Sequence, residues 1–148
     1  MFLFGILKKL ILSYFFFHKL VFSYFFLSFF LLFYQGFIDS NDEAFLSTLK
    51  YLEQKLRRGK FLAVSEKDEM AHNSATFSYI KVLVSVGRKD EARELFENML
   101  RMLNHVGIFS ESIEPKTQEL WGNLPQSTAM VGLIDCALVL SKPWKGAF

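Results

Sequence analysis

Residues 107–126 are Gly-Ile-Phe-Ser-Glu-Ser-Ile-Glu-Pro-Lys-Thr-Gln-Glu-Leu-Trp-Gly-Asn-Leu-Pro-Gln. This stretch has no helical periodicity, and it contains Gly107, Pro115, Gly122 and Asn123, which are residues typical of turns. Apolar residues at helical spacing resume on both sides of it. The pattern therefore predicts a long ordered loop that joins two helices.

The helix before this loop is expected from about Asp90 to Val106, where Gly107 would stop it. Its buried face is predicted to consist of apolar residues at helical spacing, namely Ala92, Leu95, Phe96, Met99, Met102, Leu103 and Val106. After the loop, Pro125 can occupy the first turn of a final helix that extends to about Leu140, because the missing N–H costs nothing there.

Two further helices are expected upstream. Ser40 and Glu43 have the spacing of a capping box, and the helix that they begin would end near Gly59. Its apolar stripe is Phe45, Leu49, Leu52 and Leu56. A second helix is predicted from Met70 to Val86, with Phe77, Ile80, Leu83 and Val84 on its inner face. No strand-type alternation is present, so the predicted class is all-α, built from antiparallel helix pairs.

The N-terminal part differs in composition from the rest. Twelve of the eighteen Phe residues precede Ser40, and residues 20–38 contain no charge. An uncharged stretch of this length can cross a membrane as a helix. Lys8, Lys9 and Lys19 precede it, so an inserted helix would keep the N-terminus inside. A Phe-rich apolar helix buried in the core of a larger domain is the alternative interpretation.

Several kinds of function are disfavoured by composition. The formal charge of +2 is too small to favour nucleic acid as a partner. The single cysteine, Cys136, cannot form an internal disulfide, which fits a reducing, cytoplasmic location, and its apolar neighbours favour a buried structural thiol over a nucleophile. His18, His72 and His105 lack ligand-like spacing, so neither a metal nor another cofactor is expected.

The loop of residues 107–126 resembles a motif of glycoside hydrolase family 15, the glucoamylase and trehalase-like enzymes. That motif is Gly-Leu, a small residue and Glu, then an acidic-Pro-x-Thr-Gly segment, then Gly-Asn-Phe-Pro-Gln. Residues 87–96 look like the family's Gly-Arg-x-x-Glu-Ala-Arg-x-Leu-Phe helix opening, and residues 28–42 resemble its Ser-Leu-Leu-Leu-Leu-Pro-x-x-Gly-Phe segment. The resemblance covers roughly residues 28–142. It divides the chain into a Phe-rich segment of uncertain status, 1–27, and a partial hydrolase domain, 28–148.

The resemblance implies the C-terminal helix pairs of an (α/α)6 toroid that hydrolyses an α-glucoside oligosaccharide or disaccharide with inversion. In such a mechanism one carboxylic acid protonates the leaving oxygen, and a carboxylate activates water on the opposite face. By matching of residues, Glu111 falls on the family's general base. Without the resemblance, its spacing alone favours a solvent-exposed loop acid with no catalytic role. Asn123 and Gln126 are candidates for sugar contact or for shaping the loop, and Trp121 either stacks on a sugar ring or packs locally.

Two departures from the family bear on activity. The general-acid motif has no counterpart in these residues, and Gln126-Ser127-Thr128-Ala129-Met130 lacks the His of the family's Gln-Ala-Phe-Ser-His. The expectation is a truncated hydrolase that is inactive as an isolated chain and that relies on a missing N-terminal half or on self-association. A non-catalytic helical module anchored in a membrane by residues 20–38 is the alternative function.

Overall fold

The computed structural model describes residues 39–141. The predicted Phe-rich apolar helix, the membrane contact through residues 20–38 and the boundary at residue 27 lie outside this range. Among residues 39–141, no helix has the length and apolar character needed to span a membrane.

The described chain is mostly helical, with four helices and five two-residue strands. In chain order the elements are α3 (Glu43–Leu56), β1 (Arg57–Arg58), β2 (Phe61–Leu62), β3 (Ala71–His72), α4 (Asn73–Ser85), α5 (Lys89–Arg101), β4 (Ser112–Ile113), β5 (Leu120–Trp121) and α6 (Ser127–Leu140). The strands form an antiparallel β1–β2 hairpin and an antiparallel sheet of order β3-β4-β5. The prediction that strands are absent was wrong, because two-residue strands are too short to produce an alternating pattern.

Helix α3 buries the stripe that its spacing predicts: Phe45, Leu49, Leu52 and Leu56 are all buried. The predicted capping box was wrong. The N-cap is Asp42 rather than Ser40, and its side chain accepts hydrogen bonds from the backbone N–H groups of Ala44 and Phe45. A carboxylate does this well, because it satisfies two orphan donors and also suits the positive end of the helix dipole.

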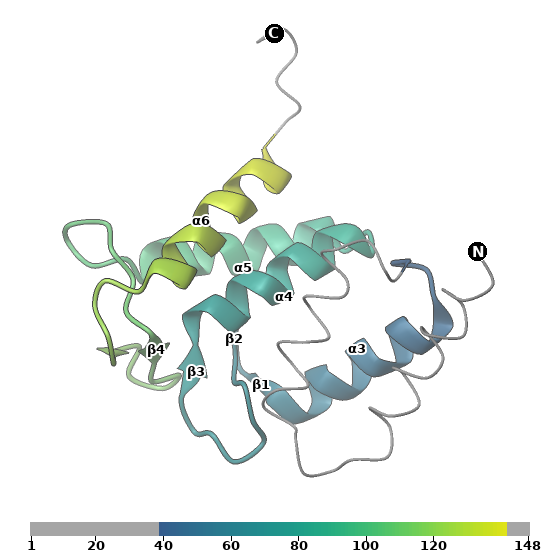
Figure 1. The fold of residues 1–148 in the computed structure, drawn as a ribbon, viewed down its shortest axis with the longest axis horizontal. Coiled ribbons are helices and arrows are strands. Elements are labelled where there is room, and N and C mark those ends of the chain that lie inside the picture. Colours follow the sequence, from purple (N-terminus) through teal and green to yellow (C-terminus); the bar gives the residue numbers. More distant parts are fainter. Residues whose placement is uncertain (1–38, 142–148) are drawn as a thin grey trace, which may run out of the picture.

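Helix α4 is the centre of the fold and packs against both α5 and α6 (Figure 1). Phe77, Ile80 and Leu83 are buried as predicted, whereas Val84 is only partly buried. Further buried side chains on other sides of the helix, including Tyr79 and Val82, show that it is covered nearly all round. The helix begins at Asn73 rather than Met70, because Ala71 and His72 pair with β4 instead.

Helix α5 runs beside α4 and buries Ala92, Leu95 and Met99. It ends at Arg101, five residues before the predicted end at Val106, which is 59% exposed. The physical reason is Asn104. Its Oδ1 accepts from the backbone N–H groups of Val106 and Ile108, at 3.1 and 2.8 Å, so the chain turns before it reaches Gly107.

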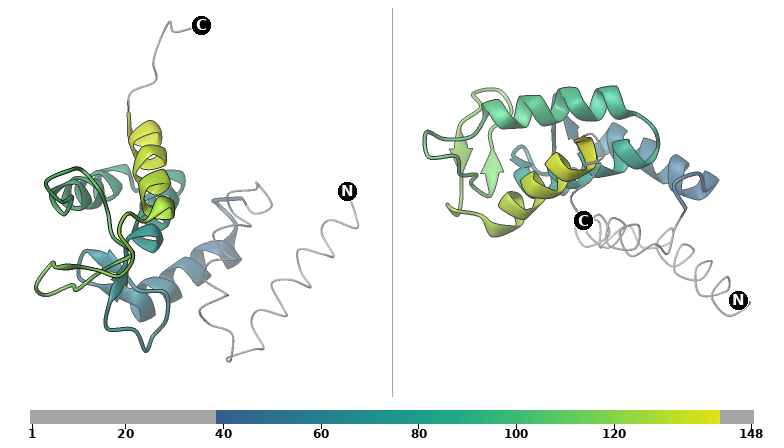
Figure 2. Two further views of the ribbon diagram at one scale, coloured as in Figure 1. Left: turned by 60° about the vertical axis from the view of Figure 1, so that its left-hand side comes forward. Right: turned by 90° about the horizontal axis from the view of Figure 1, so that it is seen from above.

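Helix α6 crosses over α4, as the two views of Figure 2 show from different sides. It begins at Ser127, so Pro125 precedes the helix and does not occupy its first turn. It comes close to α4 at Gly132, where a Cβ would lie 2.7 Å from the Cβ of Phe77. Lys81 of α4 and Asp135 of α6 form an ion pair of 2.6 Å beside this contact.

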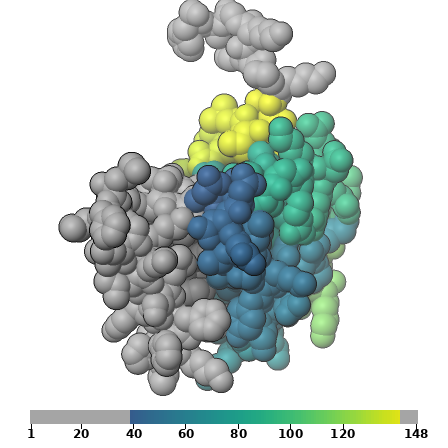
Figure 3. Space-filling view, turned by 90° about the vertical axis from the view of Figure 1, so that its right-hand side faces the viewer, coloured from purple at the N-terminus to yellow at the C-terminus, as the bar shows by residue number. Residues whose placement is uncertain are grey.

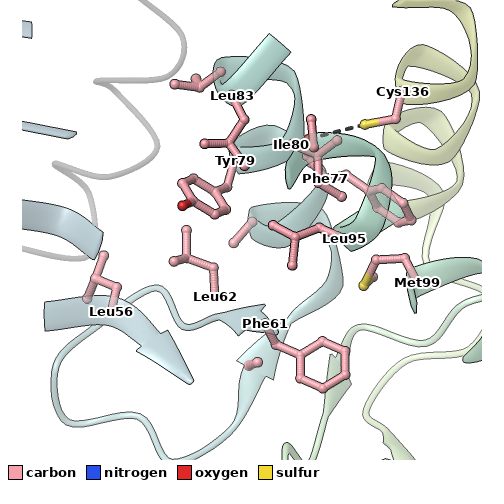
Figure 4. Packing of buried hydrophobic residues seen from close by; sticks show 14 of the residues in the cluster. Leu56, Phe61, Leu62, Phe77, Tyr79, Ile80, Leu83, Leu95, Met99 and Cys136 are labelled. Carbon is pink, nitrogen blue, oxygen red and sulfur yellow. Dashed lines mark hydrogen bonds between the residues drawn. The ribbon is translucent and has the colours of Figure 1, made fainter. Parts of the chain in front are cut away.

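The core lies between these elements, and Figure 4 shows its centre. Leu62 and Tyr79 lie on one side of α4, and Phe77 and Cys136 lie where α4 meets α6. Phe77 also makes edge-to-face contacts with Phe96 and Phe109, which joins α4 to α5 and to the long loop.

A polar cluster of four residues, Glu53, Tyr79, Arg88 and Glu91, links α3, α4 and α5. Arg88 donates to Glu53 at 2.6 Å and to Glu91 at 2.6 and 2.8 Å, and the Tyr79 hydroxyl donates to Glu53 at 2.5 Å. Burial and the neighbouring Glu53 carboxylate raise the pKa of Tyr79, so its phenol stays protonated and keeps donating.

The apolar face of α6 is exposed over much of its length. Val131, Ile134 and Leu138 are 59%, 58% and 67% exposed, and they lie on one side of the helix because they are spaced by three and four residues. The last turns of α6 project at the top of Figure 3, in yellow, beside the green atoms of the α4–α5 region. The fold of residues 39–141 is thus a small helical assembly, and a closed toroid of helix pairs is not seen in it.

Candidate functional site

The three-stranded sheet holds residues 107–126 in place. His72 pairs with Ser112, and Ser112 pairs with Trp121, so β4 is the middle strand. Phe109 and Ile113 are fully buried and anchor the loop in the core. Glu111 lies between these two anchors, immediately before the start of the middle strand β4.

The backbone of Glu111 is held from both sides. Its N–H donates to the carbonyl of Asn123 at 2.9 Å, and its carbonyl accepts from the N–H of Asn73 at 3.1 Å. The amide Nδ2 of Asn73 also donates to the carbonyl of Ser110 at 2.8 Å. A residue in a long loop is therefore as firmly fixed as one in a strand.

The side chain of Glu111 lies over Gly122. A Cβ at Gly122 would be 3.0 Å from both the Cβ and the Oε2 of Glu111, and Gly122 has a φ of +83°. Glycine is the residue that tolerates both conditions. The N–H of Asn123 points to Oε2 of Glu111 at 3.4 Å. Glu111 as a whole is half-buried, and its carboxylate lies beside Gly122 and the N–H of Asn123.

Glu114 has a structural role in the turn between β4 and β5. Its carboxylate accepts from the N–H of Lys116 at 2.8 Å and from the N–H of Thr117. These hydrogen bonds, the one from Thr117 first, lower the pKa of Glu114. The backbone N–H of Gln118 closes the same turn by donating to the Glu114 carbonyl at 2.8 Å.

The other predicted site residues surround Glu111 without all converging on it. Asn123 contacts it directly. Trp121 lies on β5 opposite Ser112, and its side chain is 56% exposed. The N–H of Gln126 donates to the carbonyl of Phe109 at 2.9 Å, so its backbone fixes the end of the loop, where the Leu124-Pro125 peptide bond is cis.

Two residues of this arrangement were not recognised in the sequence. Asn73 was assigned to the interior of a predicted helix, and Gly122 was noted only as a turn residue. Asn is favoured at the N-cap, one position before Asn73, so the sequence offers only a weak local signal that this residue lies at a helix start. Its partner at Glu111 is far along the chain, so no local pattern connects the two.

The environment of the single cysteine is that of a structural residue rather than of a nucleophile. Cys136 is buried, and its thiol donates to the carbonyl of Phe77 at 3.2 Å. Burial raises the pKa of Cys136 to about 12, so the thiol is not a nucleophile near neutral pH. Within residues 39–141, no three His, Cys, Asp or Glu side chains are grouped so that they could hold a metal ion.

Comparisons with known proteins identify trehalases as similar sequences. The chain is 37% identical over 109 residues to the trehalase of Thermoplasma volcanium and 35% identical over 109 residues to that of Thermoplasma acidophilum. It is 32% identical over 96 residues to trehalase 1 of Sulfolobus acidocaldarius. No family model matches the chain, and no solved structure matches it.

The aligned segment is a large share of this chain but a small share of each trehalase. The aligned segment covers 69% of this chain but only 18% of the first trehalase and 19% of the second. The chain thus spans about a fifth of the length of these relatives. Over about two thirds of its own length, it is similar to one segment of trehalases, which are glycoside hydrolases of carbohydrate metabolism.

Proposed function

We propose that residues 107–126 form the general-base loop of an inverting α-glucoside hydrolase of glycoside hydrolase family 15, with Glu111 as the base. The observation that carries this proposal is the fixed carboxylate of the half-buried Glu111, held over Gly122 beside the N–H of Asn123. The similarity to trehalases supports the same assignment.

In this mechanism Glu111 takes a proton from a water molecule. The water oxygen attacks the anomeric carbon from the face opposite the leaving group, the bond to the leaving oxygen breaks, and a second carboxyl group protonates that oxygen. The similarity to trehalases favours trehalose, a disaccharide of two glucose units, as the substrate. Trp121, whose exposed ring suits the apolar face of a pyranose, and the side chains of Asn123 and Gln126 are the groups that we propose for sugar contact.

The general acid must come from outside these 148 residues, because they contain no counterpart of the family's general-acid motif. We therefore propose that the α4–α5 pair and α6 are part of a larger toroid of helix pairs. The exposed apolar face of α6 is the surface that a neighbouring helix pair would cover. We expect no release of glucose from trehalose by this chain alone.

The test is a graft into a complete enzyme. The segment of Thermoplasma acidophilum trehalase that aligns with this chain is replaced by the corresponding residues of this chain, and glucose release from trehalose is measured. We expect the grafted enzyme to be active, and Glu111→Gln to lower its kcat roughly 100- to 10,000-fold, because loss of a general acid or base has effects of this size.

The matched control is Glu114→Gln in the same graft. Glu114 is an acid of the same loop, but its carboxylate is occupied by the turn. We expect this variant to keep kcat within about threefold, which is less than 1 kcal/mol in the barrier. An active graft in which Glu111→Gln is as fast as the parent would refute the assignment of the base.

A further inference from the structure

Asn73 is a buried polar residue that contacts the proposed catalytic loop from another part of the chain. It is the first residue of α4 and is fully buried. Its backbone N–H donates to the carbonyl of Glu111 at 3.1 Å, and its side-chain Nδ2 donates to the carbonyl of Ser110 at 2.8 Å. One residue thus holds two consecutive carbonyls.

The first of these donors is available because of the helix start. The first N–H groups of a helix have no partner within the helix. Asn73 is the first helical residue after the N-cap His72, so its own N–H has no acceptor within α4 and is free to reach the loop. The start of a rigid central helix therefore serves as the fixed point for Glu111.

The side chain of Asn73 is costly to bury. Among the described residues its Oδ1 has no hydrogen-bond partner, although it is fully enclosed. A buried amide with one unpaired atom opposes folding, and an apolar side chain of similar shape avoids that cost. The hydrogen bond from Nδ2 to the Ser110 carbonyl offsets part of this cost.

On the other side of Glu111, the loop is tied to Asn123 by two hydrogen bonds. The N–H of Glu111 donates to the Asn123 carbonyl at 2.9 Å, and the N–H of Asn123 faces Oε2 of Glu111 at 3.4 Å. Without the Asn73 contacts, the peptide that joins Ser110 and Glu111 can rotate about this second attachment. The carboxylate would then move away from the Asn123 N–H.

We propose that Asn73 is a positioning residue, which orients the Glu111 carboxylate by fixing the Ser110 and Glu111 carbonyls from the start of α4. This proposal rests on the proposed role of Glu111 as the general base. Asn73 itself does not touch the substrate or exchange protons.

The test uses the amide resonance of Asn123 in the full chain as a reporter of the Glu111 carboxylate. In ¹⁵N-labelled protein, this resonance is followed between about pH 3 and pH 7, the range in which carboxyl groups ordinarily titrate. We expect a pH-dependent shift that disappears in Glu111→Gln. In Asn73→Leu, we expect the shift to fall roughly threefold or more, because a hydrogen bond weakens steeply with distance and angle.

Asn73→Leu is chosen because it separates positioning from folding. It fills a similar volume and removes the unpaired Oδ1, which offsets part of the stability lost when the buried Ser110 carbonyl loses its partner, so we expect the variant to remain folded. The matched control is Asn98→Leu. Asn98 is also buried, in α5, and its Nδ2 has no partner among the described residues. We expect Asn98→Leu to leave the Asn123 shift unchanged.

An unchanged Asn123 shift in folded Asn73→Leu would overturn the proposal, and so would the absence of any shift in the parent chain. Both results concern geometry, and neither depends on catalysis. If Asn73→Leu fails to fold, Asn73→Ala removes the Nδ2 donor without adding bulk or a titrating group, and the same reduced shift is expected. Failure of the proposed function would instead appear as full activity of Glu111→Gln in the grafted trehalase, with the NMR result intact.

Discussion

Gly122 and Glu111 occupy adjoining space, so the position of the carboxylate depends on the absence of a side chain at residue 122. A Cβ there would lie 3.0 Å from the Cβ and from the Oε2 of Glu111. Rotation of the Glu111 side chain can relieve the contact with Oε2, but the contact with Cβ can be relieved only by a small shift of the backbone. The position of the proposed base thus depends on Gly122, a residue without a side chain.

We expect Gly122→Ala to destabilise the chain by about 1 kcal/mol more than Gly107→Ala, because crowding costs are of this size. The two glycines have similar φ values, +83° and +77°, so both substitutions carry the same left-handed strain. A Cβ at Gly107 meets nothing within 4 Å, which makes it a matched control. The measurement is urea denaturation. Equal losses in the two variants would show that Glu111 does not lie over Gly122.

At this scale the sequence singled out Glu111 as a candidate but did not predict its surroundings. Its resemblance to a family motif singled it out, and Asn123 was named with it. The contacts that hold it, from Asn73 and over Gly122, are between residues far apart along the chain. Such contacts leave no local pattern, since Asn and Gly are common in loops for other reasons.

At the scale of the elements, the helices were predictable, and so were some of their ends, such as Leu140 of α6, whereas other ends were not. The stripes of α3 and α5 follow from apolar spacing, which is a local property. The start of α4 at Asn73 depends on pairing of the preceding residues with β4, and the end of α5 at Arg101 depends on the turn at Asn104. Both are set by contacts outside the helix concerned.

The contact between α4 and α6 gives a test at this scale. Ala in place of Gly inside a helix ordinarily stabilises by about 0.5–1 kcal/mol. We expect Gly132→Ala instead to destabilise by about 1–3 kcal/mol, because the new Cβ would lie 2.7 Å from the Cβ of Phe77, and overpacking costs this much.

Chemical denaturation measures this effect, with Val131→Ala as the control. Val131 is in the same helix and is 59% exposed, so its truncation should change the free energy of unfolding by less than about 0.5 kcal/mol. A gain in stability for Gly132→Ala would mean that α6 lies farther from α4 than described here.

At the scale of the whole molecule, one side of α6 is both apolar and exposed. Val131, Ile134 and Leu138 form this face. Composition and periodicity predicted that α6 is helical and apolar. They did not predict which side of it is covered, because that depends on the neighbours present around it.

We expect the isolated chain to self-associate through this face, since contiguous exposed apolar surface drives association. Val131→Lys should lower the average mass measured by sedimentation equilibrium. Val106→Lys is the matched control, because Val106 is equally exposed, at 59%, but lies in the loop after α5. The same decrease in both variants would indicate a general effect of charge and not a contact through α6.

The central claim is that Glu111 is the base of an inverting hydrolase, and the most direct measurement is rescue by azide in the grafted trehalase. In Glu111→Ala, azide can enter the space of the carboxylate and attack the anomeric carbon of trehalose in place of water, while the general acid still protonates the departing glucose. We predict that azide restores part of the lost turnover and that the product, identified by NMR, is β-glucosyl azide, with inverted configuration. Glucose release that continues at the parent rate in Glu111→Ala, or an azide product with retained configuration, would contradict this account.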